Sequence, residues 1–315
     1  MNDLPNPITY AIPAFVLLMI VEIAVMRRRG GEAYATADTA TSLLLGLGST
    51  IAGALSAGLI YALAVGVYDF GGGTLQLPQF GFAWWAWPLC FLLDDLMYYV
   101  FHRSAHRVRW FWAAHVVHHS SQHYNLSTAL RQTWTGFLAL AFVFRLPLFL
   151  IFPPAMLFFC AGLNLIYQFW IHTEAVRRMP GWFEAVMNTP SHHRVHHGTN
   201  ARYLDRNYAG VFIVWDRLFG TFEPERDDER IHYGLVHNLG SFNLLWAAFH
   251  EWAGIVRDVW QAPWRHKLNY LIREPGWSHD ASRTTSADIR ARWEAGRVAD
   301  REIGKSRACA KGKES

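Results

Sequence analysis

The stretch HRSAHRVRWFWAAHVVHHSSQH, residues 102–123, contains six of the sixteen histidines of this 315-residue chain. These histidines and a later block at 192–197 repeat two spacings, HxxxH once and HxxHH twice. The residues are His102 and His106, then His115, His118 and His119, then His193, His196 and His197. Residues i, i+3 and i+4 share one face of a helix, so each block presents its imidazoles in one direction. Eight imidazoles are too many for one metal ion and suit two.

The composition argues against a soluble protein. Hydrophobic residues make up 52% of the chain and charged residues only 17%, below the usual quarter. A net charge of +4 without a basic stripe gives no indication of nucleic-acid binding. The three cysteines are scattered and form no CxxC motif, so they indicate neither zinc nor redox chemistry.

Several apolar runs are long enough to cross a bilayer. They are residues 8–26, 41–67, 81–101 and 136–171, the last of which is predicted to form two spans that meet at Pro153 and Pro154. Arg27–Arg29 place the end of the first run on the cytoplasmic side. Five crossings then put every histidine block on that side. Arg145 is costly in mid-span and suggests either a re-entrant hairpin or snorkelling to an interface.

The predicted fold is therefore an all-α membrane protein with four to five transmembrane helices and a cytoplasmic-side helical cap that holds a histidine-rich di-iron site. We expect N-terminal transmembrane helices in residues 1–80 and a catalytic domain in 81–241. Residues 242–272 mix aromatic and basic residues at helical spacing, as in a helix lying on a membrane surface. Residues 273–315 are polar and predict a partly disordered tail.

The histidines are the candidate metal ligands, because neutral imidazole binds iron and zinc. His172 follows the fourth apolar run and reaches the same membrane side, so it completes a predicted set of nine. Two irons could share the electrons needed to split O₂ and oxidise an unactivated C–H bond. A neutral cage beside lipid suits a hydrophobic substrate that enters from the bilayer.

Other residues are candidates for orienting the imidazoles or for binding the metal. His192 lies four residues before His196, and His123 lies one turn after His119. The remaining candidates are Asp95 and Tyr99, which share a helical stripe with His102 and His106, and Glu174, Asp205, Asn207 and Asp216. Asp94 is expected instead to cap or bridge neighbouring helices. An acid inside an apolar span, such as Asp95, is a functional candidate by default.

At these residues the chain resembles the fatty acid hydroxylase and sterol desaturase superfamily, and within it the alkylglycerol monooxygenase-like proteins. The text that carries the resemblance is DDLMYYVFHRSAH (94–106), WAAHVVHHSSQHYNLSTALRQ (112–132), WIHTE (170–174), NTPSHHRVHHGTN (188–200) and NYAGVFIVWDRLFGTF (207–222). The order and spacing match from about residue 80 to 240.

The resemblance implies a helical membrane enzyme that hydroxylates a lipid with O₂ at a cytoplasmic-side di-iron centre. It implies that the HxxxH and HxxHH histidines bind the two irons and that His172 supplies a ligand between those motifs. It also implies an external reductant, either a tetrahydropterin or an electron-transfer protein. The lipid could be an ether lipid, a fatty acyl chain or a sterol-like molecule.

Three alternatives remain open at this point. The same cage could desaturate a lipid instead of hydroxylating it. A zinc-dependent membrane hydrolase would need the glutamate of an HExxH motif, but Arg103 occupies that position. A haem protein could use the pairs His102/His115 and His106/His119, each thirteen residues apart, although a polar segment separates the members of each pair.

Overall fold

The computed structural model describes residues 4–30 and 34–297. Within these ranges the chain is helical and forms no strand beyond two isolated bridges. The α-helices are α1 (Pro7–Arg28), α2 (Thr36–Asp69), α3 (Ala86–Arg107), α4 (Arg109–His119), α5 (Leu126–Ala129), α6 (Leu146–Phe149), α7 (Pro154–Trp170), α8 (Gly181–Val186), α9 (Pro190–His196), α10 (Val214–Leu218), α11 (Leu244–Gln261) and α12 (Asn269–Ile272). A π-helix (Phe70–Thr74), 3₁₀-helices at Ala141–Arg145 and Trp264–His266, and a helix over residues 286–297 complete the fold. The prediction of an all-helical chain is confirmed.

The helices α1 and α2 expose their apolar side chains. Asn6 caps α1 by accepting a hydrogen bond from the Ile8 amide, and Pro7 occupies its first position. By length and hydropathy, Pro7–Arg28 and Thr36–Thr74 are the two described helices that could cross a membrane, and only 11% and 6% of their apolar windows are buried. A core helix of a soluble protein would bury most of this surface.

The two glycines Gly46 and Gly48 let the loop after α5 pack directly against α2. A Cβ atom at Gly46 would lie 2.5 Å from the Leu130 carbonyl oxygen, and one at Gly48 would lie 2.2 Å from the Trp134 indole nitrogen. Gly46 and Gly48 thus allow a loop, rather than another long helix, to approach α2 closely.

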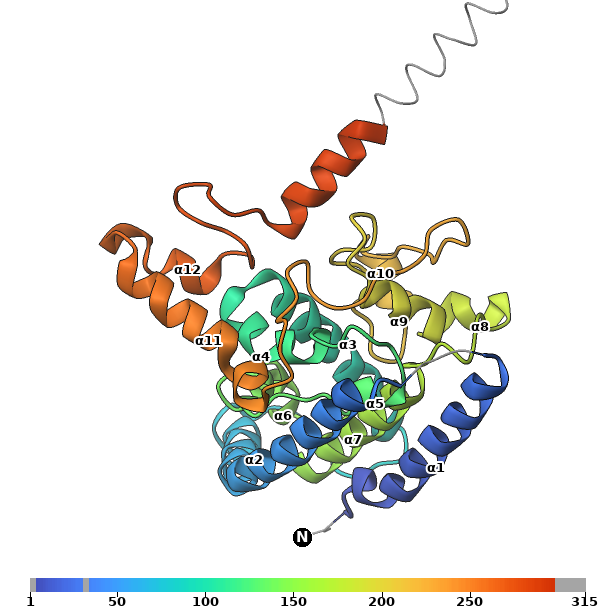
Figure 1. Cartoon of the computed structure of the whole chain (residues 1–315). Helices are drawn as coiled ribbons and strands as arrows, with labels where there is room; N and C mark the ends of the chain where they lie inside the picture. The colour runs from blue at the N-terminus through green and yellow to red at the C-terminus, as the bar shows by residue number, and fades with distance from the viewer. Residues whose placement is uncertain (1–3, 31–33, 298–315) are drawn as a thin grey trace, which may run out of the picture.

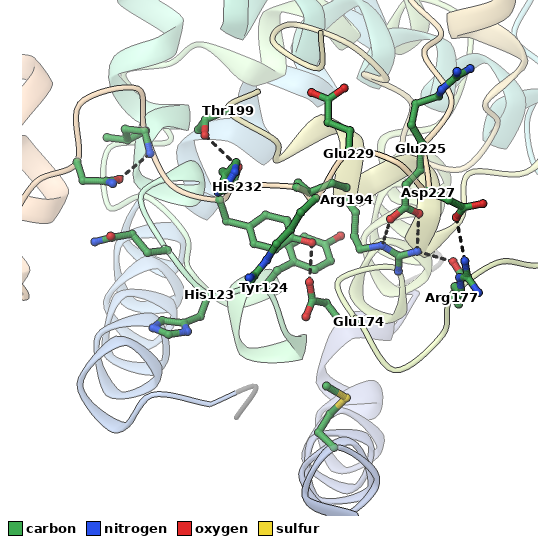
Figure 2. Close-up of a pocket in the computed structure, with 18 of the residues that line it drawn as sticks. His123, Tyr124, Glu174, Arg177, Arg194, Thr199, Glu225, Asp227, Glu229 and His232 are labelled. Atoms are coloured by element: carbon green, nitrogen blue, oxygen red, sulfur yellow. Dashed lines mark hydrogen bonds and ion pairs between the residues drawn. The ribbon is translucent and has the colours of Figure 1, made fainter. Parts of the chain in front are cut away.

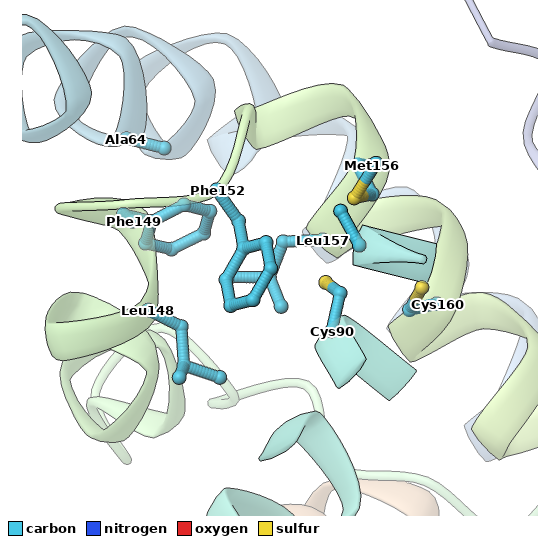
Figure 3. Packing of buried hydrophobic residues seen from close by; sticks show 9 residues of the cluster. Ala64, Cys90, Leu148, Phe149, Phe152, Met156, Leu157 and Cys160 are labelled. Atoms are coloured by element: carbon cyan, nitrogen blue, oxygen red, sulfur yellow. The ribbon is translucent and has the colours of Figure 1, made fainter. Parts of the chain in front are cut away.

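The largest apolar cluster joins α3 to α7 (Figure 3). Cys90 of α3 and Cys160 of α7 are buried in it as free thiols, beside Phe152 and Leu157. Cys309 lies outside the described residues. This cluster fixes the two helices that later deliver histidines to the site.

The predicted hairpin 136–171 forms only one long helix. α7 has 17 residues, whereas the preceding half consists of a 3₁₀-helix and the single turn α6. Pro147 and Pro153 lack the amide hydrogen that a continuous helix needs. Arg145 donates to Asp94 of α3 at 2.6 Å, so its charge is paired within the protein. The count of four to five crossings therefore stays a prediction.

The ends of the long helices meet on one side of the molecule (Figure 1). The Arg29 side chain, just after α1, donates to the Ala175 carbonyl at 2.7 Å. Asp38, in the first turn of α2, pairs with Arg131. Because α3 and α7 also end there, four helices converge beside the histidines.

Candidate metal centre

Three helices and one helix end position the predicted ligands. His102 and His106 lie in the last two turns of α3, and an extended residue, Val108, separates α3 from α4. α4 carries the first HxxHH block, α9 carries the second, and His172 follows the end of α7. Pro190 at the start of α9 suits a first helical position, where no amide hydrogen is needed.

The structure brings all nine histidines together in two groups. The five-histidine group is His102, His106, His115, His119 and His196, and the four-histidine group is His118, His172, His193 and His197. Within each group, one nitrogen of every ring lies within 4.8 Å of the others. Neither group contains a carboxylate or a cysteine among the residues that the structure describes.

Each HxxHH block divides its side chains between the two groups. In α4, His115 and His119 belong to the five-histidine group, whereas His118 belongs to the other. In the second block the assignment is reversed, because the i, i+4 pair joins the four-histidine group and His196 joins the five-histidine group. The helices α4 and α9 therefore bridge two adjacent sites.

Backbone carbonyls determine which ring nitrogen carries the proton. His118 Nδ1 lies 3.3 Å from the Arg131 oxygen, and His172 Nδ1 lies 2.7 Å from the Gln168 oxygen. A carbonyl can only accept, so Nδ1 is the donor and Nε2 carries a free lone pair. His102 and His196 are oriented in the same way by the carbonyls of Tyr208 and Arg206, at 2.7 and 2.9 Å.

The Nε2 atoms face one another at distances that suit the ligands of a shared cation. His118 Nε2 and His172 Nε2 are 3.1 Å apart, although both are acceptors. Other Nε2 pairs in the two groups are 2.8–3.2 Å apart. Two ligands at about 2.1 Å from one ion and at a right angle would lie about 3.0 Å apart. The donor set therefore fits metal ions in both groups.

Burial lowers the pKa of imidazoles in both groups. Desolvation lowers the pKa of His118 to about 4, and it lowers the pKa of His119, His193 and His197 well below the usual value. Positive charge on neighbouring imidazoles acts in the same direction. His106 Nε2 is buried without a hydrogen-bond partner, as a nitrogen reserved for a metal would be.

Residues 87–221, which contain all nine histidines, match the family model described as fatty acid hydroxylase. This part of the chain is therefore similar to fatty acid hydroxylases. The predicted resemblance to this superfamily is confirmed.

Curated proteins that are similar to this chain include alkylglycerol monooxygenases. The proteins from Danio rerio and Homo sapiens are 39% and 38% identical over 88% of this chain and 61% of their own length. An ornithine lipid hydroxylase from Rhizobium tropici is 26% identical over 62% of this chain and 59% of its own. The chain thus spans about three fifths of the length of these relatives. No solved structure matches it.

The carboxylates of Asp95 and Asp216 contact the loop behind the imidazoles rather than the imidazoles themselves. Asp95 accepts hydrogen bonds from the amides of Val211 and Phe212 at 2.8 and 3.0 Å. Asp216 accepts from the Tyr208 amide at 2.8 Å, and burial raises its pKa to about 6 although its hydrogen-bond donors oppose this. Both acids fix the loop whose Tyr208 carbonyl orients His102.

Tyr99 is linked to Asp216, because its hydroxyl lies 2.8 Å from the Thr221 hydroxyl, which in turn donates to Asp216. Asp205 lies 3.3 Å from His106 Nδ1. Asn207 holds the His192 carbonyl at 3.0 Å. These three residues support the site without joining either group.

His192, His123 and Glu174 lie outside both groups. The His192 ring packs edge-on against Phe222 at 5.4 Å. Glu174 accepts a hydrogen bond from the Tyr233 hydroxyl at 2.8 Å, and no described contact joins it to a ligand. The interpretation of Glu174 as a residue that orients an imidazole has no support in these contacts.

Sequence reasoning missed several buried charges that position the site. Arg131 donates to the Val117 carbonyl and to Asp38, which ties α4 to α2. Arg194 donates to the Thr173 and Val176 carbonyls and thus fixes the loop after His172. Glu22 of α1 accepts from the Leu126 amide and from Thr173. Glu22 could have been found, because it is an acid inside an apolar run.

A polar cavity of about 1060 Å³ lies on the far side of Tyr124 from the four-histidine group, and Figure 2 shows part of its lining. Tyr124, Glu174 and Arg194 are part of its wall. The Tyr124 ring is buried, and its centroid lies 5.8 and 5.2 Å from the ring centroids of His172 and His197. Tyr124 therefore separates these imidazoles from the cavity.

Proposed function

We propose that the chain is a membrane-bound di-iron monooxygenase that hydroxylates a C–H bond of a lipid with O₂. The observation that carries this proposal is the pair of all-histidine groups whose Nε2 lone pairs face one another. We assign the nine histidines as the ligands of two irons. Such irons would supply the electrons that activate O₂.

The residues of the chain orient the ligand imidazoles and exclude water from them. The carbonyls of Gln168, Arg131 and Tyr208 fix the imidazole tautomers, so the ligand atoms are presented without a proton. All but one of the nine rings are buried, which keeps bulk water from the ligands. An uncharged histidine set also avoids placing carboxylate charge beside an apolar substrate.

Membrane association is supported by α1 and α2, whose apolar surfaces are exposed. Arg27 and Arg28 lie in the last turn of α1, on the side of the molecule where the histidines lie. The excess of positive charge at that end favours a cytoplasmic position of the metal site. The number of crossings in this proposal remains four to five.

A lipid substrate is supported by the relatives. Their names include alkylglycerol monooxygenase, ornithine lipid hydroxylase and cholesterol 25-hydroxylase. Each name contains a lipid, but the lipid differs from one name to the next. We propose an ether lipid, a fatty acyl chain or a sterol-like molecule. The electrons come from an external donor, either a tetrahydropterin or an electron-transfer protein.

The test is to purify the full chain from membranes, quantify its iron and incubate it with lipid extract, a reductant and O₂. A lipid that gains one oxygen atom supports hydroxylation, whereas loss of two hydrogens would assign a desaturase. Two irons per chain without a Soret band would exclude haem. Turnover of the zinc-loaded protein in strict anaerobiosis would overturn the oxygenase proposal and favour a hydrolase.

A further inference from the structure

A second cavity, of about 270 Å³, borders the five-histidine group. His106, His119 and His196 of that group form part of its wall, as does His197 of the four-histidine group. The loop at Leu235 and Val236 lines this cavity and the polar one, and thus lies between them.

The wall of this cavity is mainly apolar, in contrast to the charged wall of its neighbour. Trp112 and Val116 of α4 contribute to it, together with Leu204, Leu239 and Ile289. A small cavity lined in this way binds an apolar group better than a charged one. Val236 is 49% exposed, so the wall reaches the protein surface at this loop.

Residues 275–289, which we call the roof, close one side of the cavity. The roof is tied to the helix that carries His115 and His119. The Arg109 amide at the start of α4 donates to the Arg273 carbonyl at 3.0 Å. Asp258 of α11 accepts from Arg109 at 2.7 Å and from Arg283 at 2.6 Å, so one carboxylate joins α4, α11 and the roof.

Two further contacts fix the shape of the roof. Gly276 has φ +83°, and a Cβ atom there would lie 2.3 Å from the Thr284 carbonyl oxygen. The two ends of the roof therefore approach closely only because residue 276 is glycine. The helix 286–297 is held by Arg202, whose guanidinium lies 5.1 Å from the Trp293 ring. Ile289 thus occupies a defined place in the wall.

We propose that this cavity binds the alkyl chain of the lipid substrate and that the roof limits the length of chain that fits. This inference rests on the proposed function. A flexible unbranched chain can enter a cavity of this size, whereas a whole membrane lipid cannot. The chain would lie beside the imidazoles with its polar end toward the exposed loop at Val236.

The experiment uses the full, iron-loaded chain in nanodiscs without O₂, so that binding is measured without turnover. The probes are linear alkyl alcohols of eight and twelve carbons that carry a terminal photoreactive diazirine. Peptide mass spectrometry after illumination then locates the label. Because the hydroxyl end would lie at the Val236 loop, we expect the terminal diazirine to label residues in 275–289, with more label from the longer probe.

Two substitutions at Ile289 should change chain-length preference in opposite directions. Each methylene that no longer fits costs roughly fourfold in affinity, so Ile289→Trp should lower labelling by the twelve-carbon probe about tenfold. The eight-carbon probe should lose much less. Ile289→Ala should instead favour the longer probe. The control is Leu218→Trp, at an exposed position of α10 that lines neither cavity.

Label outside the cavity, or an unchanged ratio of the two probes in both Ile289 variants, would overturn the inference. If Ile289→Trp misfolds, labelling by both probes will fall together. The shift toward the longer probe that we expect for Ile289→Ala then tests the inference by itself. If the label lies in the cavity but no lipid gains oxygen, the cavity assignment stands and the proposed function fails. If lipids are hydroxylated but the label lies elsewhere, the proposed function stands and the cavity assignment fails.

Discussion

The two histidine groups are built from shared helices but have different surroundings. α4 and α9 contribute to both groups, whereas α3 contributes only to the five-histidine group and His172 only to the other. The five-histidine group contributes His106, His119 and His196 to the wall of the apolar cavity, whereas the four-histidine group contributes His197. The Nε2 atom of His106 has no hydrogen-bond partner. The four-histidine group is covered by Tyr124, with the polar cavity beyond.

This difference indicates a division of labour inside one site. The five-histidine group, with three rings on the apolar cavity, is placed to meet a hydrocarbon. The four-histidine group has one ring there and lies nearer to the polar cavity, behind Tyr124. Their supports differ too, because the loop at Asp205–Tyr208 orients the first group and the end of α7 orients the second. Substitutions can therefore disturb one group at a time.

Removal of a ligand should give the largest effect. His196→Ala removes a nitrogen from the five-histidine group, and His118→Ala removes one from the four-histidine group. Supporting residues alone change activity up to about 100-fold, so we expect each variant to lose at least that much turnover and part of its iron. Iron content and lipid oxygenation measure this, with membrane accumulation as the check on folding.

The matched control is His123→Ala, because His123 belongs to the same sequence block but to neither group. It should retain its iron. Full turnover by His118→Ala or His196→Ala would refute the assignment of these ligands.

Asp205→Asn should lower the metal affinity of the five-histidine group and leave that of the four-histidine group unchanged. Asp205 lies 3.3 Å from His106 Nδ1 and has φ +55°, which asparagine tolerates well. Loss of the negative charge reduces the support of the imidazole, so metal affinity of this group should fall about tenfold. Titration with a competing chelator should show one step shifted and one unchanged. Asp227→Asn, at an exposed ion pair with Arg177, should shift neither step.

Asp258→Asn should loosen the roof without altering either histidine group. Burial opposes ionisation of this carboxyl, but hydrogen bonds from Arg283 and Arg109 outweigh it and hold the pKa of Asp258 below its usual range. Its contribution is therefore complete at neutral pH and is lost as the pH falls through that low pKa. Breaking such a pair at neutral pH should raise the equilibrium population of the open roof roughly tenfold.

Limited trypsin digestion at pH 7.5 measures this opening, because Arg273 and Arg283 flank or lie in the roof. Cleavage there should accelerate while iron content stays constant. Asp280→Asn, an exposed neighbour that bonds only locally to Ser282, is the control. Loss of iron in Asp258→Asn would contradict the separation between the roof and the metal site.

Histidine spacing was sufficient to predict which rings meet, because the i, i+3 and i+4 positions share a helix face. It could not predict how each block divides between two groups, since that depends on where α3 and α7 place the other rings. The supports at Arg206 and Tyr208 are backbone carbonyls and leave no trace in side-chain identity. The described part of the predicted tail packs on the site through ion pairs rather than through an apolar pattern. Residues 298–315 lie outside the described residues.

Tyr124→Phe should give the smallest effect and sharpen the interpretation of the four-histidine group. The Tyr124 hydroxyl donates to the Ile171 carbonyl at 2.9 Å, and loss of one buried hydrogen bond should lower the free energy of unfolding by about 1 kcal/mol. The ring remains, so its contacts with His172 and His197 should keep the group closed and its iron bound. Thermal unfolding beside Tyr10→Phe, at an exposed position of α1, measures the difference. A loss of iron as large as in His118→Ala would instead mean that the hydroxyl, rather than the ring, protects this group.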